Sequence, residues 1–129
     1  MIFSLAIYAP PSSQSSLSAY RFAESIVAAE HTLFRVFFYH DGAYHGSGLH
    51  CYPQDEVDVS QQWQSLAKQH DIDLVVCIAA GLKRGIIDEQ EADRYSQPHY
   101  NLGESFTLSG LGQLVDATIH SDRVITFGD

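Results

Sequence analysis

The chain has 129 residues, of which 45% are hydrophobic and 18% charged, and its formal net charge at pH 7 is −9. This composition predicts one folded domain over residues 1–129 and excludes a disordered protein. No apolar run approaches the ~20 residues that span a bilayer, and the N-terminus has no signal-peptide pattern, so we expect a cytoplasmic protein without membrane contact. With only seven Lys and Arg residues, the chain lacks the cationic surface that direct binding of nucleic acid requires.

Apolar runs and helical periodicities alternate along the chain. Strands are predicted at residues 2–8, 31–39, 72–79 and 123–127, with a short additional strand near Phe106. Helices are predicted at 17–29, after the N-cap candidates Ser12 to Ser16, and at 58–70, 88–95 and 109–120. Residues 41–53 hold three Gly and one Pro and indicate a long loop. The pattern predicts an α/β fold: a single three-layer sandwich around a mainly parallel sheet of four to five strands, with flavodoxin-like winding.

Cys77 is the main candidate for chemistry. It lies near the carboxyl end of the apolar run Leu74–Ile78, where parallel sheets gather their ligands. The small residues 79–81 that follow let the backbone turn and another molecule approach. Lys83 and Arg84 place two cations near that turn, and if a helix starts there its N-terminal amides add partial positive charge; both effects favour the thiolate. The competing interpretation is a cysteine that only packs in a buried strand.

Three segments carry a resemblance to a known family. Residues 76–80, followed by 83–89, are similar to the cysteine segment of the TusD/DsrE family. Residues 36–44 and the stretch 106–114, which is completed by 122–127, match in the same order. The resemblance runs nearly end to end and assigns the functional cysteine to Cys77. It also implies a DsrE-like version of the sandwich.

The resemblance implies a sulfurtransferase that holds sulfane sulfur as a persulfide on Cys77. A TusD-like subunit receives sulfur from a TusA-like donor and passes it to a TusE-like acceptor for 2-thiolation of the tRNA wobble uridine. It works beside TusB-like and TusC-like subunits in a hetero-oligomer, and we expect no direct tRNA binding. The alternatives are a DsrE-type subunit of cytoplasmic sulfur oxidation and a non-catalytic scaffold. No cofactor is expected, since persulfide exchange is displacement at sulfur.

Other side chains invite different chemistry. Cys51 is a candidate second carrier or resolving thiol, but an incidental loop cysteine is favoured. His40, His45, His50 and Cys51 suggest zinc, although their spacing fits no compact ligand set, so solvated loop histidines are favoured. No metal is therefore expected.

Residues 10–16 join a strand to a helix, as phosphate-binding turns do. They have no Gly and two Pro, so a capped helix start is favoured over a flavin site. His70, His99 and His120 have no nucleophile near them in the sequence, so a Cys–His hydrolase is not expected. Trp63 is expected to pack in the core or against another subunit. Glu89 and Glu91 are expected on the solvated face of their helix. The aromatic-rich second strand is a candidate surface for sister subunits.

Overall fold

Five parallel strands form one sheet in the order β4-β3-β2-β1-β5 in the computed structural model, which describes residues 1–129. The chain steps from β1 outward to β4 and then returns to place β5 beyond β1, so its direction across the sheet reverses once. The strands are β1 (Ile2–Ile7), β2 (Thr32–Phe38), β3 (Asp73–Cys77), β4 (Phe106–Ser109) and β5 (Arg123–Phe127).

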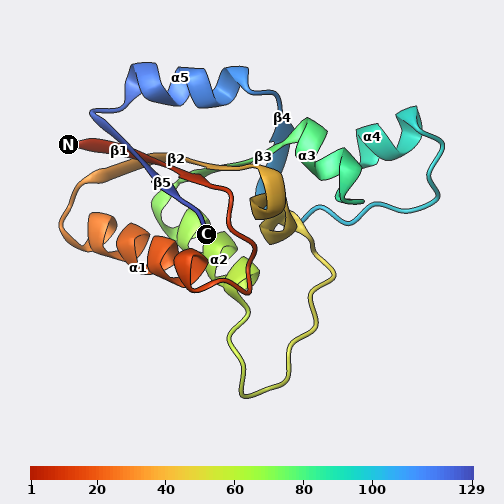
Figure 1. Ribbon diagram of the computed structural model, residues 1–129, viewed down its shortest axis with the longest axis horizontal. Coiled ribbons are helices and arrows are strands. Elements are labelled where there is room, and N and C mark those ends of the chain that lie inside the picture. The colour runs from red at the N-terminus through yellow and green to blue at the C-terminus, as the bar shows by residue number, and fades with distance from the viewer.

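Helices cover both faces of this sheet (Figure 1). α1 and α2 lie on one face and α5 lies on the other, while α3 and α4 extend beyond the end of β3. The helices are α1 (Gln14–Ala28), α2 (Val59–His70), α3 (Ile78–Lys83), α4 (Glu89–Arg94) and α5 (Gly112–His120), with a 3₁₀ helix, η1 (His40–Gly46), after β2. The predicted three-layer α/β sandwich is confirmed.

Side-chain caps explain where three of the helices begin. Ser13 Oγ accepts a hydrogen bond from the Ser16 amide before α1, and Asp58 Oδ1 accepts one from Gln61 N before α2. Asp88 caps α4 in the same way, through a 2.9 Å bond from Glu91 N. Each cap satisfies one of the amides that a first helical turn leaves unpaired.

The core lies mainly between the sheet and the α1–α2 layer. Trp63 of α2 is fully buried, and its ring meets those of Tyr20 and Phe38 edge-on at 5.1 and 5.7 Å between centroids. Trp63 is therefore a core residue. The aromatic run of β2 is not the predicted subunit surface, because Phe37 and Phe38 have no exposed area. Alternation along the central strand places these two rings on opposite faces of the sheet, and both faces are covered.

Two predicted boundaries are wrong near the carboxyl ends of the strands. Residues 41–53 are not loop throughout, because 40–46 form the 3₁₀ helix η1. β3 ends at Cys77 rather than at Ala79, and residues 78–83 form a helix. Pairing with β4 stops at the Cys77–Ser109 pair, after which Ala79 and Ala80, both good helix formers, continue as α3. No helix in the structure is both long and apolar enough to cross a membrane.

Candidate functional site

Cys77 is the last residue of β3 and the N-cap of α3. It is a free thiol, and only 7% of the residue is exposed. The chain leaves β3 into α3, whereas it leaves neighbouring β4 toward α5 and reverses direction across the sheet. Such a reversal opens a crevice at the carboxyl ends of a parallel sheet, and Cys77 lies at this point.

A pocket of about 610 Å³ opens at this edge of the sheet. Tyr8 and Tyr39 follow β1 and β2 directly, and their rings are 5.6 Å apart. Together with side chains from α3 and the start of α5, they surround Cys77; the lining residues are Tyr8, Tyr39, His40, Cys77, Ala80, Lys83, Arg84 and Leu111. The pocket thus combines a sulfur nucleophile, aromatic walls and cations.

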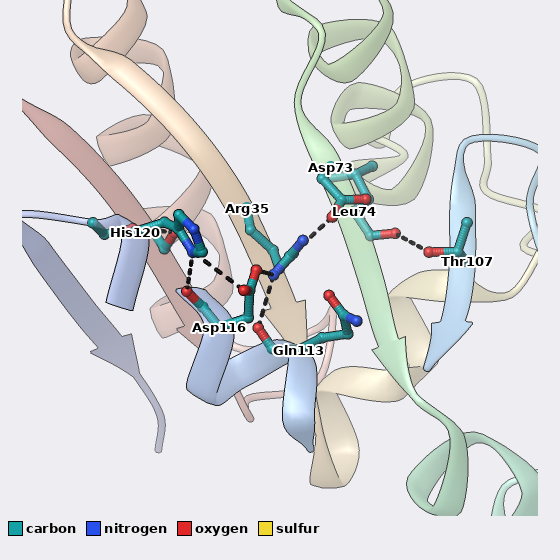
Figure 2. Close-up of polar contacts among 9 residues, drawn as sticks. Arg35, Asp73, Leu74, Thr107, Gln113, Asp116 and His120 are labelled. Carbon is teal, nitrogen blue, oxygen red and sulfur yellow. Dashed lines mark hydrogen bonds and ion pairs between the residues drawn. The ribbon is translucent and has the colours of Figure 1, made fainter. Parts of the chain in front are cut away.

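An ion-pair cluster around Arg35 of β2 joins the sheet to α5 (Figure 2). Arg35 Nε donates to Asp73 of β3 at 2.6 Å, and Nη1 donates to Asp116 Oδ2 and to the Gln113 carbonyl of α5, both at 2.9 Å. Arg35 and Asp73 therefore lie on the face of the sheet that α5 covers. Because side chains alternate along a strand, Cys77, four residues after Asp73, points to this same face.

Lys83 and Arg84 both line the Cys77 pocket, but their charges are not equivalent. Arg84 Nε lies 3.1 Å from Asp41 Oδ1, and its Nη1 donates to the Ala80 carbonyl at 3.2 Å. Asp41 therefore offsets much of the Arg84 charge. Lys83 is exposed and has no ion-pair partner, so it is the free cation of the pocket.

Four lining residues were missed by sequence reasoning. Tyr8, Tyr39 and Leu111 are apolar or aromatic residues at element ends, and His40 was considered only as a metal ligand. A usable signal did exist for three of them. Tyr8 and Tyr39 end predicted strands and His40 directly follows one, and the carboxyl ends of parallel strands meet at one edge. The pairing of Asp41 with Arg84, 43 residues away, has no local signal.

The metal candidates do not converge. The structure has no group of three or more His, Cys, Asp or Glu side chains placed to hold an ion. His40 lines the Cys77 pocket, His50 contacts the Tyr44 carbonyl at 2.8 Å, and Cys51 is exposed on its loop. Cys51 does not line the Cys77 pocket, so it is not placed as its resolving thiol.

His45 is not the solvated loop histidine that was predicted. It has no exposed area and its Nε2 lies 3.1 Å from Ser16 Oγ, while its ring packs 5.0 Å from that of Phe38. Burial lowers its pKa from 6.5 to about 3, so the imidazole is neutral. Its interior position follows from η1, which turns the side chain under the end of the sheet instead of leaving it on a loop.

The turn after β1 is a capped helix start. Ser16 Oγ lies 2.7 Å from the Pro10 carbonyl and 3.1 Å from the Ala9 carbonyl, so this hydroxyl is used inside the turn. The solvated face predicted for Glu89 and Glu91 is correct only for Glu89. Glu91 is 5% exposed and lies 3.6 Å from Arg94 Nε, because the short α4 turns this side of the helix inward.

The three histidines considered for a hydrolase dyad, His70, His99 and His120, lie apart from Cys77. His120 of α5 contacts Asp116, His70 lies in the last turn of α2, and none of the three lines the Cys77 pocket. His99 belongs to a neighbouring and larger pocket of about 810 Å³, which shares Lys83 with the first pocket and does not include Cys77. The smaller pocket is the candidate site because it contains Cys77, whereas the larger one does not.

The DsrE/DsrF-like family model matches residues 1–127. The chain belongs to this family. A sulfurtransferase TusD homolog of Pseudomonas aeruginosa is 43% identical over 128 residues, covering 99% of this chain and 98% of its own. A TusD homolog of Vibrio parahaemolyticus is 47% identical, and the match covers 89% of this chain and 88% of the homolog. A protein of Allochromatium vinosum named DsrE is also 47% identical, and that match covers 93% of this chain and 92% of the relative.

The fold of this family member also resembles a solved structure. The ychN protein of E. coli matches with a TM-score of 0.66 at 22% identity, covering 98% of this chain and 97% of its own. The family prediction is confirmed, and the names of the relatives agree with the predicted enzyme class, a sulfurtransferase.

Proposed function

We propose that the chain is a sulfur-carrier subunit that accepts sulfane sulfur on Cys77 and passes it to a partner protein. The observation that carries the proposal is the placement of a free cysteine in a pocket at the carboxyl edge of the sheet. A thiol that only packs in the core needs no such opening. The relatives named as sulfurtransferases support the same chemistry.

The transfer is a displacement at sulfur. The Cys77 thiolate attacks the outer sulfur of a donor persulfide, a new S–S bond forms, and the donor's own S–S bond breaks to release its thiolate. The product is a persulfide on Cys77, and no external oxidant is consumed. Lys83 is the cation that favours approach of the anionic donor, while Arg84 is held beside the pocket by Asp41.

We propose that the chain acts in a hetero-oligomer with TusB-like and TusC-like subunits, between a TusA-like donor and a TusE-like acceptor. Leu111, Val115 and Ile119 support this assembly. They follow one another at every fourth position along α5 and are 58–73% exposed, so they form an apolar stripe on its outer side. A net charge of −9 argues that another subunit holds the tRNA.

The pathway we favour is 2-thiolation of the tRNA wobble uridine. A DsrE-type role in sulfur oxidation is the second candidate, since the relative named DsrE is as similar as the TusD homologs. The test replaces the chromosomal gene with a Cys77→Ser allele and measures 2-thiouridine in total tRNA, with Cys51→Ser as the matched control. Loss of the modified base in the Cys77 allele alone supports the proposal. Unchanged 2-thiouridine together with impaired sulfur oxidation favours the second candidate.

A further inference from the structure

The Cys77 pocket holds an imidazole, His40, that has no role in the proposed transfer. His40 lines this pocket and comes from the end of β2, whereas Cys77 comes from the end of β3. Among the groups around it, imidazole is the one whose ordinary titration falls near neutral pH. The charged and titratable groups that share this site are Asp41 on the same turn, Cys77, Lys83 and Arg84 from β3 and α3, and the phenols Tyr8 and Tyr39.

The backbone at His40 has a conformation that residues other than Gly rarely adopt. Its φ is 52°, in the left-handed region that favours Gly and Asn. The residues around it hold this conformation in place. The Gly42 amide donates to the Tyr39 carbonyl at 2.9 Å, and Gly42 packs so tightly on the Ile7 carbonyl that no Cβ would fit. Strained positions of this kind persist where packing enforces them, often at functional sites.

Asp41 connects His40 to Arg84, and both of these residues line the pocket. Its Oδ2 lies 3.8 Å from His40 Nδ1, and its Oδ1 accepts from Arg84 Nε at 3.1 Å. The first distance is an ion-pair contact rather than a hydrogen bond, so it strengthens when the imidazole takes up a proton. Asp41 lies on the Nδ1 side of the ring, so Nε2 is the nitrogen left to contact a group in the pocket.

If Cys77 starts as a thiol rather than as a thiolate, sulfur transfer also moves a proton between two sulfur atoms. When Cys77 begins as a thiol and the donor as a persulfide anion, the products are the Cys77 persulfide anion and the donor thiol. One S–S bond breaks, one forms, and one proton leaves Cys77 and ends on the departing sulfur. We propose that His40 carries this proton. It takes the proton from the Cys77 thiol and returns it to the donor sulfur, and this role rests on the proposed carrier function of Cys77.

The test uses His40→Asn and His40→Lys in a Cys51→Ser background, so that Cys77 is the one thiol present. Asn accepts the left-handed backbone but does not exchange protons, and Lys keeps a cation without a neutral-pH base. His50→Asn is the control, because His50 lies on the same segment outside the pocket. Uptake of sulfur from glutathione persulfide is followed by intact mass from pH 5.5 to 8.5, and iodoacetamide alkylation of Cys77 is measured over the same range.

We expect both His40 variants to take up sulfur about a hundredfold more slowly at pH 7, and their uptake rate to recover as the pH rises. The rate of Cys77 alkylation should likewise be lower at pH 7 and recover at higher pH. The control keeps the parental profile. Parental rates in His40→Asn, or full rescue by Lys, overturn the proton-transfer role while leaving the carrier function intact. If the parent takes up no sulfur but its alkylation still depends on His40, the carrier function fails and the coupling of the two side chains stands.

Discussion

Lowering the pH should destabilise the fold through one residue, His45. Its side chain is fully buried, and burial lowers its pKa to about 3. The Ser16 hydroxyl lies 2.7 Å from the Pro10 carbonyl and donates to it, so His45 Nε2 donates its own proton to Ser16 Oγ. Nδ1 is then unprotonated and has no hydrogen-bond partner. A second proton would place a charge in this interior without a carboxylate to meet it.

The sign and size of this stability change follow from the difference in proton binding by His45 between the folded and unfolded states. An unfolded histidine binds its proton near pH 6.5, whereas folded His45 does so only near pH 3. Between these values the unfolded state holds more protons, so stability is lost as the pH falls through this window. The loss approaches about 1.4 kcal/mol per pH unit and amounts to about 2 kcal/mol between pH 7.5 and pH 5.

Urea unfolding at pH 7.5, 6 and 5 measures this loss directly. His45→Gln should remove the corresponding part of the pH dependence, and His50→Asn should retain it. Should the Gln variant fail to fold, an NMR titration of the wild-type imidazoles supplies the same information, since the His45 resonance should not move above pH 5. A His45 midpoint above pH 5, or a stability that is flat over the window, would refute the reasoning.

Three further changes test the site and its support. Gly42→Ala places a Cβ against the Ile7 carbonyl and should cost about 1–3 kcal/mol in urea unfolding, whereas an unchanged midpoint contradicts the packing of η1. Arg35→Met leaves two half-exposed carboxylates unpaired and should cost about 1–2 kcal/mol; a neutral effect means that the cluster adds no net stability. Lys83→Glu should slow sulfur uptake from glutathione persulfide several-fold, with Lys68→Glu on α2 as the control, and equal rates remove Lys83 from the mechanism.

The position of Cys77 could be predicted because its signals are local. A continuous apolar run predicts a buried parallel strand, and that strand ends at Cys77. The small residues that follow predict a turn, but residues 78–83 form a helix instead. Lys83 ends the short helix α3 and Arg84 is its C-cap, so their presence at the pocket needed no knowledge of distant contacts. Ligands of a parallel sheet bind at this edge, which made Cys77 the candidate residue before the fold was known.

The rest of the site depends on contacts between distant segments. A stretch rich in Gly and His indicates a loop, and nothing in its pattern shows that η1 buries His45 while leaving His40 at the pocket. The same holds for Asp41, whose partner Arg84 joins it only in the folded chain. The positive charge that sequence reasoning assigned to Arg84 is therefore partly neutralised, and this correction depends on a contact that only the structure shows.

The central claim is that Cys77 carries sulfur, and intact mass after incubation with a persulfide donor tests it most directly. Wild type, Cys77→Ser and Cys51→Ser are compared before and after reduction. We predict a gain of about 32 Da, one sulfur atom, in wild type and in the Cys51 variant, lost on reduction and absent from the Cys77 variant. A gain that persists without Cys77 would assign the sulfur to Cys51, and no gain in any form would contradict the carrier function.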